Sequence, residues 1–199
     1  MADGRPRRRR RADRPDVGRR ARLGVASRRV EIVWDRRWPF DVAAIVAARA
    51  LGELPSDELP AAAERLILAG YATDELCSLV GLHDVDPWLA DACFDRSLRA
   101  LGLLMDRPTA VVVRSLDWAQ RIVAGRVTPI QGAGGIGGMW RDHDDCMPDG
   151  SERDWRAFYG DWAEYDFSSP DRESRDRRVA KLDADVRERA RRFVQRYGG

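Results

Sequence analysis

The sequence is poor in several residue types that carry chemistry or cross-link a fold. Among its 199 residues are two histidines, one lysine and three cysteines, and the cysteines show no CxxC spacing. An odd number of cysteines in a chain of this size argues against a disulfide framework. No apolar run approaches the roughly 18 residues of a membrane span, and no apolar stretch follows the basic N-terminus. We therefore expect a cytoplasmic protein without a membrane segment.

Catalytic motifs are also scarce. No GxSxG occurs, and Ser115 and Ser151 have no identifiable base. Cys146 follows His143 closely, but residues three apart in a loop rarely form a working thiol–imidazole dyad. Residues 132–138 contain a literal GxGxxG, yet the preceding segment is expected to be helical and an acidic loop follows that would repel phosphate. We therefore expect no catalytic residues and no bound cofactor.

The charge of the chain is divided into two parts. Residues 1–29 contain twelve arginines and three aspartates, a net of +9, and the formal total of +2 leaves −7 on residues 30–199. The first part has almost no large apolar residues and predicts a disordered arm. The second is long enough for a single folded domain. In an alternative interpretation the arginine-rich leader precedes the true start, which would lie at Val17 or Val25.

The arginines of the arm predict one possible partner. Guanidinium groups bind the phosphates of DNA or RNA through counterion release, without sequence preference. The densest run consists of Arg7, Arg8, Arg9, Arg10 and Arg11. No aromatic residues alternate with them for base stacking, and the acidic domain would repel a phosphate backbone. Nucleic-acid binding is therefore an alternative hypothesis.

Apolar periodicity and capping residues predict a compact all-α bundle of about seven helices over residues 30–199. Asp86 and Thr128 each precede a proline, which is typical of a helix start, and the last and longest helix ends near Tyr197. Residues 111–113 favour a strand when taken by themselves, but the pattern continues far enough to predict a helix. Cys77 and Cys93 lie in apolar patterns and are predicted to be core residues.

The segment after Thr128 gives conflicting signals. Thr128 and Gln131 form a capping box, which predicts a helix. However, five of the seven residues 132–138 are glycines. Each glycine costs about 1 kcal/mol in a helix interior, roughly 5 kcal/mol together. Either packing compensates and a helix forms, or the segment is a loop.

Both histidines lie among acids. His83 precedes Asp84, and His143 lies between Asp142 and Asp145. If the two segments met in space, their imidazoles and carboxylates could hold a divalent metal ion and support a hydrolase. The spacing matches no motif of known geometry, so solvated acidic turns are the main interpretation.

One aromatic stripe is prominent. Trp155, Phe158, Tyr159 and Trp162 recur at helical spacing and share one face. Such a stripe is usually core; if exposed, it would anchor a protein partner.

The central sequence resembles an uncharacterised family of small all-helical proteins from GC-rich bacteria, over roughly residues 75–195. The residues of its IVxGxxxPxxGA motif are Ile122, Val123, Gly125, Pro129, Gly132 and Ala133. The resemblance implies a helical fold and no activity. The positions that depart from it, where helix formers and a bulky residue would be expected, are Gly134, Gly135, Gly137 and Gly138.

Together these features predict a non-enzymatic intracellular interaction protein, immunity- or antitoxin-like or regulatory. Its acidic helical body would engage a basic protein partner, because opposite charge speeds encounter and suppresses wrong partners. The alternatives are nucleic-acid binding through the arm and a metal-dependent hydrolase that uses His83 and His143 with neighbouring aspartates.

Overall fold

The computed structural model describes residues 37–81, 86–148, 152–165 and 172–198, and the regular structure of these residues is helical throughout. The α-helices are α1 (Phe40–Ala50), α2 (Leu59–Leu68), α3 (Asp74–Val80), α4 (Pro87–Ala100), α5 (Arg107–Val123), α6 (Pro129–Asp142), α7 (Glu152–Glu164) and α8 (Arg172–Tyr197). Two short 3-10 helices are η1 (Ser56–Glu58) and η2 (Asp144–Cys146). The all-α prediction is confirmed. The described residues contain eight α-helices rather than about seven, because the glycine-rich segment is a helix.

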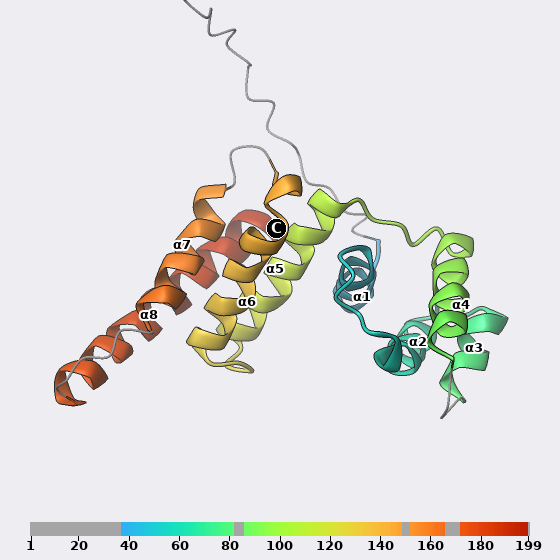
Figure 1. Ribbon diagram of the computed structural model, residues 1–199, viewed down its shortest axis with the longest axis horizontal. Helices are drawn as coiled ribbons and strands as arrows, with labels where there is room; N and C mark the ends of the chain where they lie inside the picture. Colours follow the sequence, from blue (N-terminus) through green and yellow to red (C-terminus); the bar gives the residue numbers. More distant parts are fainter. Residues whose placement is uncertain (1–36, 82–85, 149–151, 166–171, 199) are drawn as a thin grey trace, which may run out of the picture.

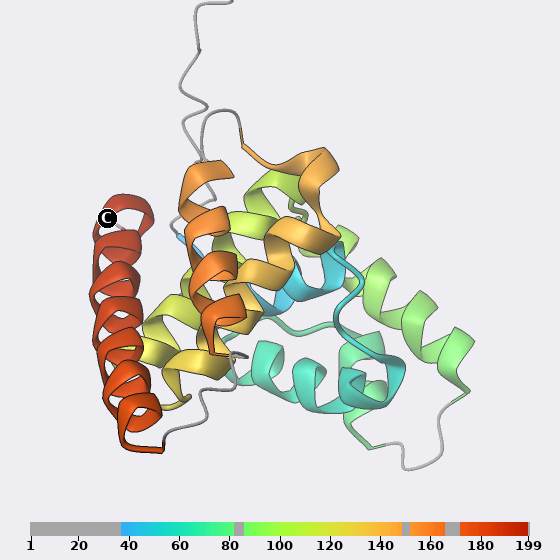
Figure 2. The same ribbon diagram turned by 60° about the vertical axis from the view of Figure 1, so that its left-hand side comes forward.

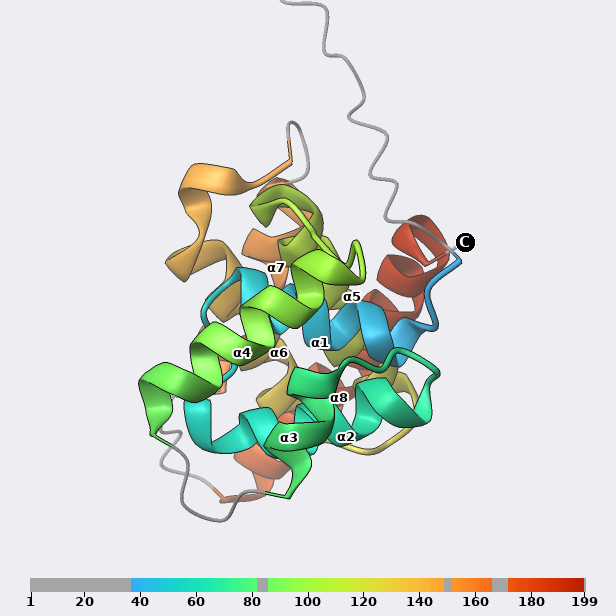
Figure 3. The ribbon, with the colours of Figure 1, turned by 90° about the vertical axis from the view of Figure 1, so that its right-hand side faces the viewer.

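The helices form two groups that meet at α1 and α5. Helix α1 lies between α5 on one side and α2 to α4 on the other (Figure 1). The face turned to the viewer in Figure 3 is built by α2, α3 and α4, while the long α8 runs along the opposite group in Figure 2. Each group has its own apolar core. A seam of small side chains joins the two groups; it consists of Ala43, Ala47, Ala110 and Val113.

Side-chain caps begin four of the helices. The side chains of Thr73, Asp86, Asp106 and Thr128 each accept a hydrogen bond from a backbone N–H in the first turn of their helix. At Thr128 the capping box is complete, because the Gln131 side chain also accepts from the Thr128 N–H at 3.1 Å. The predicted starts at residues 86 and 128 are therefore confirmed.

Four helices end in a turn that contains a glycine of positive φ. Helices α1, α2, α4 and α5 are each followed by a glycine with positive φ, between 68° and 90°. After α4, for example, the N–H of Leu103 donates to the carbonyl of Leu98 at 2.8 Å and that of Gly102 to Arg99 at 3.1 Å. This is the bond pattern of a Schellman motif, which satisfies the last carbonyls of a helix and turns the chain sharply.

Helix α6 forms despite its glycines because neighbouring helices fill the space that side chains would occupy. A Cβ on Gly135 would lie 2.5 Å from the Trp118 ring of α5, and one on Gly137 would lie 2.8 Å from the Tyr159 Cα of α7. Gly132 similarly faces Ile122. The glycines therefore allow close helix crossings, and burial of α6 in the core offsets their low helix propensity. The GxGxxG pattern lies inside this helix, where its glycines contact protein.

One face of helix α8 is buried, and the other is exposed to solvent. Leu182, Val186, Ala190 and Phe193 are buried, as its apolar pattern predicts, while its N-terminal third is exposed. Asp183 and Arg187, four residues apart on its surface, form an ion pair at 3.6 Å. Arg189 makes two bonds, at 2.7 and 3.2 Å, to Asp161 of α7 rather than pairing with Asp185 on its own helix. A bidentate geometry is stronger than a single exposed contact.

The prediction for Cys77 is wrong. Its side chain is exposed, because Leu76 and Leu79 take the inward face of the short α3 and the residue after Leu76 points about 100° away from it. Cys93 is half-buried, and all three cysteines are unpaired. The basic arm and the apolar residues that follow it, 30–34, lie outside the described residues.

The glycines of α6 can be tested as a matched pair. We expect Gly137→Ala to lower the free energy of unfolding by about 1–3 kcal/mol, because the added methyl overlaps the α7 backbone. Gly138→Ala meets nothing closer than Asp142 Oδ2 at 3.9 Å and should raise it by about 0.5–1 kcal/mol through helix propensity. Urea unfolding of both variants measures the difference. Equal effects would contradict the close-crossing explanation.

Candidate functional site

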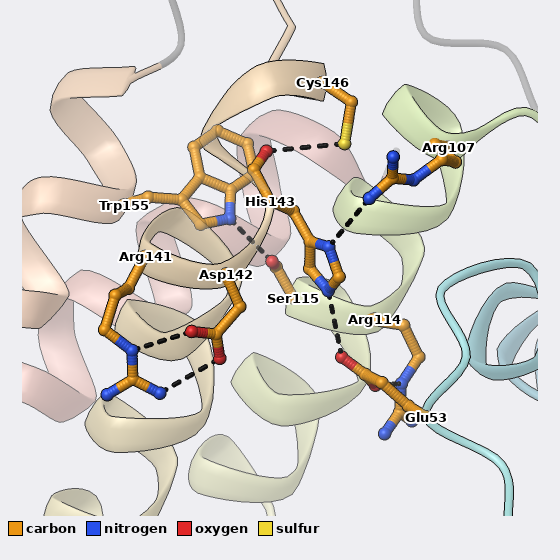
Figure 4. Close-up of polar contacts among 9 residues, drawn as sticks. All are labelled: Glu53, Arg107, Arg114, Ser115, Arg141, Asp142, His143, Cys146 and Trp155. Carbon is orange, nitrogen blue, oxygen red and sulfur yellow. Dashed lines mark hydrogen bonds and ion pairs between the residues drawn. The ribbon is translucent and has the colours of Figure 1, made fainter.

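The most concentrated polar cluster surrounds His143, directly after α6 and at the junction of the two helix groups (Figure 4). The His143 side chain is 10% exposed. Its Nδ1 lies 3.4 Å from a guanidinium nitrogen of Arg107, and its Nε2 lies 3.6 Å from Glu53 Oε1. Glu53 follows α1, whereas Arg107 begins α5. His143 is therefore held between segments that are far apart in the sequence.

Glu53 connects this cluster to the middle of α5. Its Oε2 accepts a hydrogen bond from Arg114 Nε at 2.8 Å, and Arg114 also donates to Asp117 at 3.2 Å. The side chains of this trio are between 18% and 23% exposed, so solvent screens them less than it screens surface pairs. The cluster connects the loop after α1 to α5 and to the end of α6. It therefore links the two helix groups a second time, beside the seam of small side chains.

Two acids beside His143 form ion pairs with arginines. Asp142 accepts two hydrogen bonds from Arg141, at 2.7 and 3.0 Å, and these bonds lower the pKa of its carboxyl. Asp145 pairs with Arg107 at 3.2 Å. Within the described part of the chain no three His, Cys, Asp or Glu side chains are placed to share a metal ion. Asp142, His143 and Asp145 thus do not converge, and His83 and Asp84 lie outside the described residues.

Cys146 is unsuited to nucleophilic catalysis. Its Sγ donates to the backbone carbonyl of His143 at 3.3 Å, while the imidazole nitrogens face Arg107 and Glu53. Burial raises the pKa of the thiol, so it stays protonated at neutral pH. The arrangement offers a thiol donor rather than an activated thiolate.

The aromatic stripe of α7 belongs largely to the core. Trp155 and Phe158 are completely buried. The indole N–H of Trp155 donates to Ser115 Oγ at 2.6 Å, and its ring packs edge-on against Phe193 with 5.0 Å between centroids. Tyr159 is half-buried, and Trp162 is 39% exposed. Of the four residues considered for partner binding, only Trp162 presents much of its side chain to solvent.

The structure reveals a surface that the sequence patterns did not single out. Residues 30–104 hold six arginines and thirteen acids, a net of −7, whereas residues 105–199 hold seventeen basic and seventeen acidic residues. The acids of η1, α2 and α3 whose carboxylates are bonded to no described residue are Asp57, Glu58, Glu64, Asp74 and Glu75. We call these five residues the acidic face; all except the half-buried Glu75 are exposed.

The same helix group exposes the indole of Trp88. This side chain, in the first turn of α4, is 85% exposed, and the neighbouring Leu89 is 54% exposed. The predicted helix start at Asp86 correctly places Trp88 in the first turn of a helix. Its exposure could not be predicted, because it depends on which face of α4 meets the other helices.

No protein-family model, curated protein or solved structure matches this chain. The resemblance to a helical family of GC-rich bacteria therefore stays a prediction. None of the helices in the described ranges combines the length and apolar character that crossing a bilayer requires. The residues proposed for nucleic-acid contact, 7–11, lie outside those ranges.

We expect the polar cluster to contribute to stability. Glu53→Ala should lower the free energy of unfolding by about 1–3 kcal/mol, because it leaves Arg114 and His143 without a shared acceptor. Glu152→Ala, which removes an exposed partner of Arg156 at 3.8 Å, should change it by less than about 0.5 kcal/mol. Chemical denaturation compares the two. A loss for Glu53→Ala no larger than for Glu152→Ala would show that the cluster contributes little.

A metal titration tests the hydrolase alternative. Because Asp142 and Asp145 are already paired with arginines, we expect Zn²⁺ or Mn²⁺ to leave the thermal midpoint of the full chain unchanged. Calcium serves as a control for general ionic effects. A rise in midpoint with Zn²⁺ or Mn²⁺ that disappears in His143→Ala would support a metal site instead.

Proposed function

We propose that this protein is a non-enzymatic interaction module that binds a basic protein through the acidic face and Trp88. The observation that carries the proposal is the net negative charge of the first helix group, whose described residues, 37–81 and 86–104, hold ten acids and five arginines. A surface with net negative charge attracts a positively charged partner from a distance and suppresses binding to the wrong partner.

Trp88 would supply binding affinity that the exposed acids alone do not. Exposed acids speed association but contribute modestly to affinity, since solvent and salt screen them. A large, solvent-exposed indole is the kind of side chain that anchors protein interfaces when a partner buries it. It lies at the start of α4, in the helix group whose described residues carry a net negative charge.

The arrangement of the His143 cluster supports a non-catalytic role. Its carboxylates bond to guanidinium groups, its thiol is protonated, and its imidazole is buried. The contacts of Glu53 with Arg114 and His143 join the two helix groups, which is a structural role. The interaction class is the same one that immunity and antitoxin-type proteins use against basic partners, which makes a basic nuclease-like protein the first partner to test.

Binding should depend on the acidic face and on salt. We expect the full chain, immobilised and exposed to a nuclease-treated extract of its source cells, to retain a basic protein whose affinity falls as salt is added. The double variant Asp57→Asn/Glu64→Gln should weaken that affinity roughly threefold to tenfold, and Trp88→Ala about 30-fold. Calorimetry with the retained protein provides the constants.

The matched controls change the same charge and the same kind of side chain elsewhere. Asp144→Asn/Asp185→Asn also removes two exposed acids, and Val123→Ala trims an apolar side chain that is 47% exposed, both in the second helix group. An affinity indifferent to salt, or one that these controls reduce equally, would contradict the proposal. Retention that nuclease treatment or removal of residues 5–29 abolishes would favour the nucleic-acid alternative.

A further inference from the structure

The acidic face carries more negative charge than its own helices offset. Four of its five acids lie in the first turns of η1 and α3, where a helix N-terminus contributes only about half a positive charge. Arg65 is the single basic residue of the sequence between positions 56 and 80. Two helix ends and Arg65 together offset about two of the five charges, so a net charge of about −3 is left on this face.

These acids are spread along two adjoining helices rather than gathered at one point. Helices α2 and α3 pack side by side (Figure 3), and the ten residues of α2 give it a length of about 15 Å. A single small cation cannot meet carboxylates over such a distance. The ligand that fits this face is therefore an extended segment that carries several positive charges.

The chain itself contains a segment of this kind. Residues 1–29, the basic arm, carry a net charge of +9, and their densest run is Arg7 to Arg11. Five consecutive residues span at most about 17 Å when fully extended, which is close to the length of α2. The arm and the acidic face thus match in the sign of their charge and in length.

The point where the arm joins the domain lies in the same helix group as the acidic face. The described residues begin at Arg37, and the neighbouring Trp38 packs against the core of the first helix group, as Ile67 and Tyr71 do. The 30 residues from Arg7 to Arg37 can span at most about 100 Å. Covalent geometry therefore allows the arginine run to reach every acid of the face.

We propose that the basic arm docks on the acidic face of its own chain and competes there with the basic protein partner. Guanidinium groups donate charge-assisted hydrogen bonds to carboxylates, and each exposed pair is weak by itself. The covalent connection compensates, because it gives the arm an effective concentration on the order of millimolar at the face. The competition rests on the function proposed above, whereas the docking requires no partner.

NMR spectroscopy of the full chain, freed of nucleic acid by nuclease treatment, tests the docking. The comparison is with the full-length variant Arg7→Gln/Arg8→Gln/Arg9→Gln/Arg10→Gln/Arg11→Gln, which we call the arginine-depleted chain. We expect the amide signals of η1, α2 and α3 to differ between the two chains at low salt, to the same extent at every protein concentration. The differences should vanish in about 0.5 M NaCl, where charges are screened beyond about 4 Å.

Matched charge variants locate the contact. Asp57→Asn/Glu64→Gln should remove most of the amide differences, whereas Asp144→Asn/Asp185→Asn, which removes two exposed acids from the second helix group, should preserve them. All four side chains are exposed, so the thermal midpoints should stay close to that of the natural chain. Absent differences, differences of equal size in both helix groups, or differences that grow with protein concentration would each overturn the proposal.

Partner binding separates this inference from the proposed function. The arginine-depleted chain should bind the retained basic protein about threefold to tenfold more tightly than the natural chain, because the competing arm is weakened. Equal affinities would refute the competition, even if the basic protein binds the acidic face as proposed. Amide differences that appear although no basic protein is retained would contradict the proposed function and support the docking.

Discussion

The close crossing of α6 with α5 and α7 is the constraint on which the rest of the second helix group depends. It requires residues without a side chain at positions 135 and 137, because the Trp118 ring and the Tyr159 backbone occupy the space that a Cβ would fill. The crossing buries Trp155 and Phe158 of α7 against α5 and α8. It also fixes the end of α6, and hence His143, beside α5. Packing of two helices thus determines where the polar cluster can form.

The polar cluster links this helix group to the other one. The seam of small side chains between α1 and α5 allows close approach, but its apolar contacts are non-directional. Glu53 adds direction, because it bonds to Arg114 and lies against His143 at the same time. Directional hydrogen bonds between charged groups are stronger than neutral ones and tolerate little displacement. The cluster therefore acts as a structural link that fixes the two helix groups relative to each other.

Local signals in the sequence predicted local structure well. The caps at Asp86 and Thr128 and the end of the last helix near Tyr197 involve neighbours within a few turns, so the sequence pattern contains the whole interaction. The glycine helix could not be decided in the same way, because its compensation comes from side chains on α5 and α7. His143 is a similar case: its burial depends on Glu53, which lies in the loop after α1. Pattern analysis therefore failed wherever a distant segment supplied the partner.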